Sequence, residues 1–177
     1  MPGNCEQYQF RTLSADDAEQ FRKLRIEALE TSEDILAATL EEVEGESVDS
    51  IRADIERRFK SGGFSLGAFS KQLDLVGLVN VGRPTLKRQS HIGILWGLFV
   101  SPAHRGQGVA GALLQEAISR ARASDELRQL HIEVVTSNTT AFNLYRKLGF
   151  EVYGTRPRAL QSEGGFHDEH LLAMVLK

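Results

Sequence analysis

An apolar stripe with helical spacing occupies the N-terminal part of the chain. Its members recur at three- and four-residue steps: Ala18, Phe21, Leu24 and Ala28. Such a stripe predicts a helix that packs one face against a core. Ser14 precedes the stripe and Asp17 follows three residues later, so we expect Ser14 to cap this helix.

The other elements follow from the same periodicities and from glycine and proline positions. Further helices are predicted over residues 48–59, 108–123 and 139–148. Strands are predicted over residues 8–12, 64–70, 75–81, 92–100, 130–135, 151–155 and 171–176. The second and third strands are close in sequence and predict an antiparallel hairpin. The acidic stretch 41–46 is interpreted as a solvated loop or a helix end.

The strand over residues 92–100 is apolar on both of its faces. Simple alternation places one set on one face: Ile92, Ile94, Trp96, Leu98 and Val100. Leu95 and Phe99 then lie on the opposite face. A strand that is covered on both sides has this pattern. The fold class is therefore α/β (α+β), one domain over residues 1–177 with helices on both faces of a sheet.

Composition limits the functions that this fold can carry. The chain has 177 residues, about one domain's worth. Its 21 basic and 24 acidic residues give a net charge of −3, which disfavours broad binding of nucleic acid. The single cysteine, Cys5, excludes an internal disulfide framework. No apolar run is long enough to span a bilayer, and residues 1–10 lack a signal-peptide core, so we expect a cytoplasmic protein with no membrane partner.

Three glycines, Gly106, Gly108 and Gly111, lie where a loop becomes the helix predicted over 108–123. Small residues let a ligand approach the backbone, and the first turn of a helix presents unpaired N–H groups to an anion. Arg105 adds a positive charge beside them. The spacing also matches the dinucleotide fingerprint G-x-G-x-x-G, although the strand ends several residues earlier than that motif requires. A phosphate site, a dinucleotide site and a plain helix start are all open at this point.

Two motifs resemble those of the GCN5-related N-acetyltransferases, abbreviated GNAT. The first, similar to the acetyl-CoA motif Arg/Gln-x-x-Gly-x-Gly/Ala, reads Arg105-Gly106-x-Gly108-x-Ala110. The second, similar to N-x-x-A…LY…LGF, reads Asn138-x-x-Ala141-x-x-x-Tyr145-x-x-x-Gly149-Phe150. The order and separation of the two motifs make the resemblance more specific than either motif alone.

This resemblance implies a GNAT-like single domain, with a mixed central sheet of about seven strands flanked by about four helices. It implies an acetyl-CoA-dependent N-acetyltransferase that moves an acetyl group directly from acetyl-CoA to a primary amine of a small molecule, a protein N-terminus or a lysine. Subunits of this family commonly pair through strand edges, so the resemblance makes a homodimer possible, although the sequence itself does not show one. A non-catalytic acetyl-CoA-binding or interaction module of the same fold is the alternative.

The resemblance also assigns the cofactor contacts. They come from the strand end and the glycine turn: Leu98, Phe99, Val100, Arg105, Gly106, Gln107, Gly108, Val109, Ala110 and Gly111. Asn138 and Tyr145 complete the set. A backbone N–H of Val100 or Phe99 would face the thioester oxygen, as in an oxyanion hole. Plain core packing of this strand is the other interpretation, and both can hold.

Tyr145 and Glu133 are the candidate catalytic residues. By spacing, Asn138, Ala141 and Tyr145 share one helix face. Tyr145 could protonate the departing CoA thiolate or pack as core, and Asn138 could bind the pantetheine arm or cap its helix. The spacing of Glu133 before Tyr145 resembles that in the bacterial ribosomal-protein alanine N-acetyltransferases, where a glutamate accepts the proton. A solvated glutamate and a proton route through water alone are the alternatives.

Three further features bear on the acceptor. Asp168 or Glu169, in the cluster 167–170, could hold a cationic amine, whereas adjacent residues on a strand point to opposite faces and do not converge on a metal ion. No metal is therefore expected. The acidic stretch 41–46 suits a cationic acceptor, although an amino-acid-like amine fits equally well. Trp96 is interpreted as part of the core, and a position lining the site is the alternative.

Overall fold

The computed structural model describes residues 7–32 and 36–177, so Cys5 lies outside the described residues. The strands are β1 (Gln9–Thr12), β2 (Phe64–Phe69), β3 (Leu75–Gly82), β4 (Ile92–Val100), β5 (Gln129–Val135), β6 (Glu151–Ser162) and β7 (Gly165–Val175). The α-helices are α1 (Ala18–Ser32), α2 (Leu40–Gly45), α3 (Val48–Lys60), α4 (Val109–Ala123) and α5 (Thr139–Lys147). Within these ranges, no helix combines the length and apolar character that a membrane span requires.

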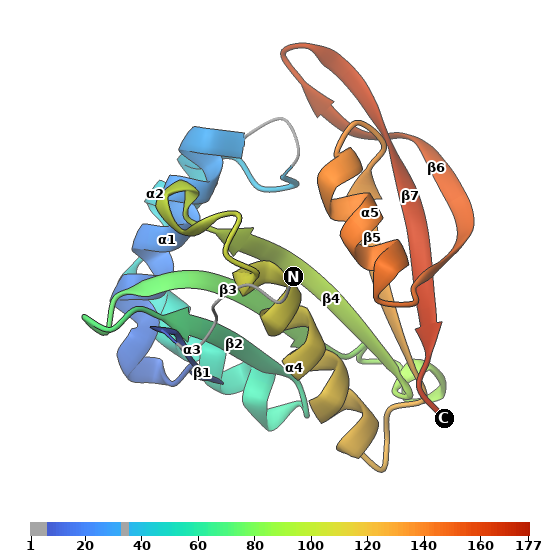
Figure 1. Ribbon diagram of the computed structural model, residues 1–177, viewed down its shortest axis with the longest axis horizontal. Helices are drawn as coiled ribbons and strands as arrows, with labels where there is room; N and C mark the ends of the chain where they lie inside the picture. Colours follow the sequence, from blue (N-terminus) through green and yellow to red (C-terminus); the bar gives the residue numbers. More distant parts are fainter. Residues whose placement is uncertain (1–6, 33–35) are drawn as a thin grey trace.

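The seven strands form one mixed sheet in the order β1-β2-β3-β4-β5-β7-β6. All neighbours are antiparallel except β4 and β5, which are parallel. The parallel pairing runs only from Ile92/Gln129 to Leu95/Ile132, although both strands continue beyond it. Figure 1 shows β4 and β5 diverging from this point, which divides the sheet into an N-terminal half (β1–β4) and a C-terminal half (β5–β7). The predicted fold class and the β2–β3 hairpin are confirmed.

Helices cover both faces of the sheet, as the apolar pattern predicts. Leu113 and Leu114 of α4 and Tyr145 of α5 belong to a buried cluster on one face. On the other face, Phe21 of α1 and Ile55 of α3 belong to a second buried cluster. In Figure 1, α4 crosses the N-terminal half of the sheet and α5 lies along the C-terminal half.

A β-bulge in β4 overturns the predicted division of its two faces. Leu78 of β3 pairs with Phe99, but Asn80 pairs with Trp96, so β4 contains one extra residue between these pairs. Gly97 takes up the irregularity with a φ of 66°, a left-handed conformation that favours glycine. Beyond the bulge the alternation is reversed. Phe99 therefore packs in the α1/α3 cluster, whereas Leu98 and Val100 pack with the α4/α5 cluster.

Three local predictions also need correction. The stretch 41–46 is largely helical, because the Oγ1 of Thr39 accepts a hydrogen bond from the N–H of Glu42 at 3.3 Å and caps α2. β6 and β7 are longer than predicted, because the exposed outer part of this hairpin has no hydrophobic alternation to reveal it. Ser14 caps a short 3-10 turn before α1, and there the Asp17 carboxylate accepts a hydrogen bond from the N–H of Ser14 at 2.8 Å.

Candidate active site

The glycine turn before α4 has the backbone geometry of an anion site. Gly106 and Gly108 have φ values of 74° and 85°, which favour glycine. Gly108 is the N-cap of α4, and no side chain caps the helix. The N–H groups of the first turn, from Val109 to Gly111, therefore have no intrahelical acceptor and point outward from a positive helix end. A Cβ atom at Gly106 would meet nothing within 4 Å, so the turn has open space beside it.

Two side chains of this turn are bound to the protein itself. The Nε of Arg105 donates to the carbonyl of Val100 at 2.9 Å, and its guanidinium lies 5.3 Å from the centre of the Phe99 ring. The Oε1 of Gln107 accepts a hydrogen bond from the Tyr8 hydroxyl at 2.8 Å. The turn is thus fixed by its side chains, and its backbone N–H groups face outward.

The second half of β4 has a free backbone edge. Past Leu95, no strand in the described chain pairs with β4 on the side of β5. Leu98, Phe99 and Val100 lie on this segment, directly after the bulge at Gly97. Peptide N–H and C=O groups along this edge are available to an extended ligand, which can pair with them as another strand would.

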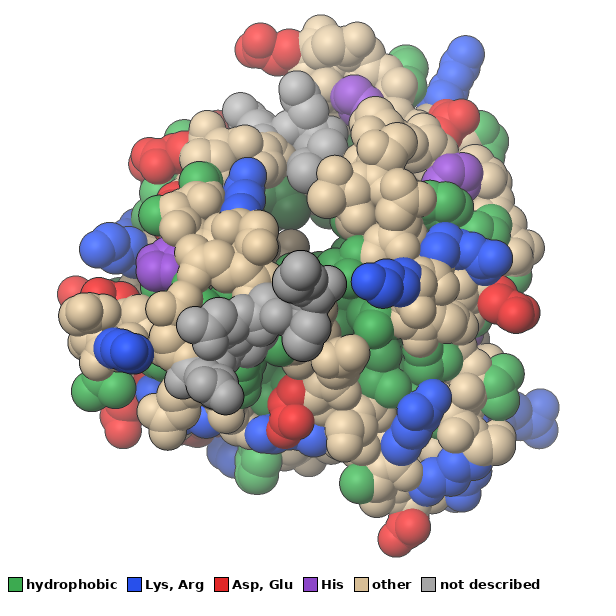
Figure 2. Space-filling model, in the orientation of Figure 1, with side chains coloured by type: hydrophobic (Ala, Val, Ile, Leu, Met, Phe, Trp, Pro, Cys, Tyr) green, Lys and Arg blue, Asp and Glu red, His purple; other side chains and the backbone are tan. Residues whose placement is uncertain are grey.

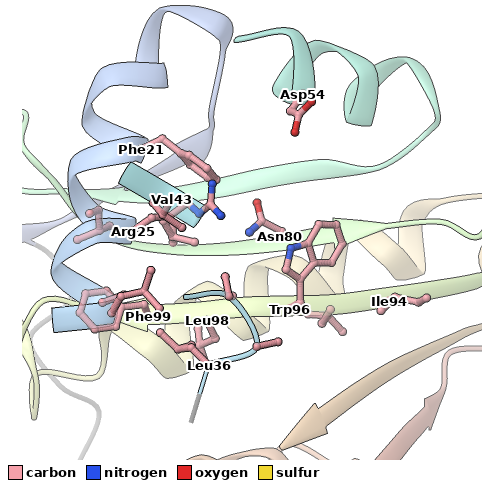
Figure 3. Close-up of a pocket in the computed structure, with 18 of the residues that line it drawn as sticks. Phe21, Arg25, Leu36, Val43, Asp54, Asn80, Ile94, Trp96, Leu98 and Phe99 are labelled. Atoms are coloured by element: carbon pink, nitrogen blue, oxygen red, sulfur yellow. The ribbon is translucent and has the colours of Figure 1, made fainter. Parts of the chain in front are cut away.

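A cavity of about 480 Å³ lies beside this free edge. It is lined by residues from both halves of the sheet and from α1, α2, α3 and α5. Figure 2 shows the molecule hollowed between the two halves, with hydrophobic side chains along the opening. In Figure 3, Phe21 and Arg25 from α1, Asn80 from β3 and Trp96 from β4 point into the same space. Trp96 is 41% exposed here, so its interpretation as core is wrong.

Tyr145 projects from α5 toward this cavity. Its ring is buried, with 5% of the residue exposed, and packs edge-on against Phe150 with ring centres 6.2 Å apart. Among the described residues its hydroxyl has no hydrogen-bond partner, and the residue lines the cavity. Burial raises the pKa of Tyr145 above its ordinary value, so the phenol keeps its proton at neutral pH. Its hydroxyl is therefore free to donate a hydrogen bond into the cavity.

Asn138 has the capping role. Its Oδ1 accepts a hydrogen bond from the N–H of Ala141 at 3.1 Å and caps α5. The side-chain NH2 group has no partner among the described residues. Capping occupies only the oxygen, so the nitrogen remains able to donate to a ligand.

Glu133 is held in an ion-pair network. Arg156 binds both of its carboxylate oxygens, at 2.6 and 3.1 Å, and reaches Glu169 at 3.3 Å. Glu133 is exposed and Glu169 is 8% exposed, and both line the cavity. Burial and the nearby Glu133 carboxylate raise the pKa of Glu169. Two carboxylates with one guanidinium leave a net charge of −1, which suits a cationic amine.

Of the predicted site residues, Tyr145, Glu133, Leu98 and Phe99 meet around the cavity. The other predicted cofactor residues lie outside its lining: Val100, Arg105, Gly106, Gln107, Gly108, Val109, Ala110, Gly111 and Asn138. Asp168 also lies outside it, and its Oδ1 accepts from the N–H of Arg158 at 2.8 Å. The cavity and the glycine turn are joined by the free edge of β4, which runs from one to the other.

Arg25 and Arg58, which line the cavity from α1 and α3, are not among the residues predicted from sequence. A signal for Arg58 was present. It continues the spacing of Ile51 and Ile55, four and then three residues on, and so lies on the buried face of α3.

Comparisons with known proteins show what the chain is similar to. The L-amino acid N-acetyltransferase of Escherichia coli is 28% identical over 102 residues, which cover 58% of this chain and 62% of that protein. The chain thus spans less than two thirds of the length of that relative. A GNAT-family acetyltransferase structure from Streptococcus pneumoniae superposes with a TM-score of 0.85 and 25% identity, covering 96% of this chain and 99% of that one.

The yncA structure from Salmonella typhimurium, which contains its cofactor acetyl-CoA, superposes with a TM-score of 0.83 and 20% identity, over 96% of this chain and 94% of that one. The sequence model of the acetyltransferase (GNAT) family matches residues 25–150. This match covers well over half of the chain and confirms the resemblance read from its two motifs. The protein belongs to the acetyltransferase (GNAT) family.

Proposed function

We propose that the protein is an acetyl-CoA-dependent N-acetyltransferase that moves an acetyl group directly to a primary amine. One observation carries this proposal. The free edge of β4 connects the uncapped start of α4 with a cavity that contains a buried tyrosine hydroxyl and a pair of carboxylates. An anion site, an extended backbone edge, a proton donor and a proton acceptor thus occur in the order that acetyl transfer needs.

The residues present fit acetyl-CoA. The N–H groups of residues 106–111 suit a pyrophosphate, because Gly106 and Gly108 allow close approach to the backbone. The N–H of Arg105 does not belong to this set, because it donates to the carbonyl of Pro102 at 3.3 Å. The edge formed by Leu98, Phe99 and Val100 suits the extended pantetheine arm. The NH2 group of Asn138 suits one of the arm's carbonyl groups. When bound, acetyl-CoA would supply the acetyl thioester.

The remaining chemistry belongs to the side chains around the cavity. A backbone N–H of β4 would polarise the thioester carbonyl. The Tyr145 hydroxyl would donate a hydrogen bond to the departing sulfur. Burial raises the pKa of Tyr145 and so disfavours transfer of its proton, whereas the hydrogen bond needs no ionisation. The departing thiolate would take its proton from water.

The carboxylate pair would take the proton from the acceptor ammonium, either directly or through a water molecule. Glu133 is the base that the sequence resemblance implies, and its two hydrogen bonds to Arg156 fix its position. Glu169 lies deeper, and its raised pKa makes it a stronger base than an ordinary carboxylate. Glu133→Gln and Glu169→Gln therefore separate the two assignments.

Calorimetry with acetyl-CoA, and with NADH as the control ligand, tests the cofactor. We expect acetyl-CoA to bind and NADH not to bind. Chromatographic detection of CoA, with a panel of primary amines, then tests catalysis. We expect Glu133→Gln to reduce turnover by about 100-fold or more, the range typical of general base removal, with acetyl-CoA affinity unchanged. Acetyl-CoA binding without CoA release on any amine would instead support the non-catalytic binding module.

A further inference from the structure

One wall of the cavity contains a guanidinium without an ionic partner. Arg58 lies on the inner face of α3 and reaches over the indole of Trp96, 4.9 Å from the ring centre. Its Nη1 donates to Ser65 Oγ at 2.6 Å and to Asn80 Oδ1 at 3.2 Å. These three contacts fix the direction of the guanidinium, and both hydrogen-bond acceptors are neutral. In the described chain, its Nε and Nη2 groups have no hydrogen-bond partner.

The acidic residues near Arg58 are engaged elsewhere. Asp54 is close enough to attract it, but the Asp54 carboxylate bonds to Arg57 at 2.8 Å. Glu46 also lines the cavity, and its carboxylate pairs with Arg25. Among the described residues, no carboxylate forms an ion pair with Arg58. Burial, together with repulsion from Arg25, lowers the pKa of this guanidinium.

A half-buried guanidinium stays charged at any ordinary pH, and a desolvated charge without a counterion is unfavourable. An anion from solution would remove that cost. The planar group, held on Trp96 with two N–H directions free, matches a carboxylate in a bidentate arrangement. This end of the cavity is thus prepared for an anionic group.

The opposite end has the opposite charge. Glu133 and Glu169, with Arg156 between them, carry a net negative charge near the point where β4 and β5 diverge. Apolar side chains of α1, α3 and β4 form the walls between the two ends: Phe21, Leu24, Ile51, Ile55 and Trp96. A ligand with an amine at one end, an acid at the other and an apolar group between them complements all three regions.

The two ends lie on different halves of the sheet. Arg58 bonds to Asn80 on β3, in the N-terminal half, and Glu133 is on β5, in the C-terminal half. A ligand that contacts both therefore lies across the space where β4 and β5 diverge. A free α-amino acid carries an amine and a carboxylate on one small molecule, whereas a lysine side chain of a protein has no carboxylate beside its amine.

We propose that the acceptor is a small zwitterion, an α-amino acid with an apolar side chain, whose carboxylate binds Arg58 while its amine faces Glu133 and Glu169. This inference rests on the proposed function and names the substrate class of the same cavity. Of the two acceptors that the 41–46 stretch left open, a cationic amine and an amino-acid-like amine, it favours the second. Of the acidic residues in that stretch, only Glu46 lines the cavity, and its charge is neutralised by Arg25.

The first test needs no variant. CoA release is measured with L-leucine, L-methionine and L-phenylalanine, and with the C-terminal amide of each. We expect kcat/KM to be about 10- to 100-fold higher for the acids, the range that a lost charge-assisted hydrogen bond produces. The amine of an amide is less basic and more of it is neutral, so basicity works against the expected result.

The second test removes the guanidinium. Arg58→Gln should reduce the preference for acid over amide to less than about threefold, and Arg58→Lys should retain part of it. Arg52→Gln, on the exposed side of the same helix where Arg52 pairs with Asp49, is the matched control and should leave the preference unchanged. Circular dichroism establishes that each variant is folded.

A binding measurement is independent of turnover. Calorimetry compares N-acetyl-L-leucine with N-acetyl-L-leucinamide on the wild-type protein, and we expect only the acid to bind appreciably. Equal binding or equal turnover of acid and amide would overturn the zwitterion while acetyl transfer to amines still stood. Failure of every amine to release CoA, with the N-acetylated acid unbound, would overturn both this inference and the proposed function.

Discussion

Replacing Tyr145 with phenylalanine isolates a single hydroxyl group. The ring would remain in its buried position against Phe150, since phenylalanine fills the same space. Among the described residues the hydroxyl has no hydrogen-bond partner, so its removal breaks no internal bond. We therefore expect the free energy of unfolding to change by less than about 0.5 kcal/mol.

The expected effect on catalysis is much larger. A hydrogen bond to a charged group contributes about 1.5–3 kcal/mol, and each 1.36 kcal/mol changes a rate by about tenfold. If Tyr145 donates to the departing thiolate, Tyr145→Phe should lower kcat by about 10- to 100-fold. The affinity for acetyl-CoA should stay the same, because the thiolate forms only as the thioester breaks.

The assay is CoA release under saturating acetyl-CoA, with calorimetry for affinity and chemical denaturation for stability. Tyr153→Phe is the matched control. Tyr153 is exposed on β6, and its hydroxyl lies 3.4 Å from His131 Nδ1, outside the cavity. The same chemical change at that position should leave kcat unaltered.

Two results would refute the reasoning about Tyr145. An unchanged kcat would show that the hydroxyl does not contact the departing sulfur. A loss beyond about 1000-fold would exceed what one hydrogen bond supplies and would require full proton transfer. That transfer conflicts with the raised pKa of this buried phenol.

Three other predictions concern two glycines with left-handed backbone conformations and the ion pair at the 3-10 turn before α1. Gly108→Ala places a side chain at a φ of 85°, a strain of about 1–2 kcal/mol that reorients the turn, so calorimetry should show about tenfold weaker acetyl-CoA binding. Gly97→Ala combines a φ of 66° with a Cβ atom 2.9 Å from Asn80 Nδ2, and denaturation should show a loss of about 1–3 kcal/mol. Asp17→Asn removes the bidentate pair with Arg11 and should cost about 2 kcal/mol at pH 7. Because hydrogen bonding to Arg11 lowers the pKa of Asp17, this difference should be complete above the unfolded-state pKa near 4 and should vanish as pH falls through the lower folded-state pKa, so an undiminished difference at pH 2 would contradict it.

The features predicted correctly from sequence are those with local causes. The helical stripe through Phe21, the β2–β3 hairpin and the glycine turn before α4 each depend on a few neighbouring residues. The two motifs were equally informative, because the family requires those residues at fixed spacing. The order of strands in the sheet has no such local cause, since β5 and β7 pair across a whole helix and a further strand.

The errors at β4 and in the cavity have a tertiary cause. Alternation assumes a regular strand, and the extra residue at Gly97 reversed the faces of Phe99 and Leu98. A glycine inside an apolar strand was the available signal, since glycine often marks a bulge. Trp96 was interpreted as core because nothing in the neighbouring sequence shows that β5 diverges from β4 beside it. The spacing of Arg58 places it on the buried face of its helix, but its lack of an ionic partner depends on residues from other elements and has no sequence signal.

The short parallel pairing between β4 and β5 has a consequence for the stability of the enzyme in solution. The two halves of the sheet pair only along residues Ile92 to Leu95 of β4. Beyond Leu95, no described strand pairs with this edge of β4. In the proposed complex, the pantetheine arm pairs with this free edge of β4. Ligand at 100 times its dissociation constant would then stabilise the fold by about 2.7 kcal/mol. The edge of β4 would be paired when acetyl-CoA binds and unpaired when CoA leaves. Resistance to heat and to proteolysis would therefore rise with the concentration of acetyl-CoA.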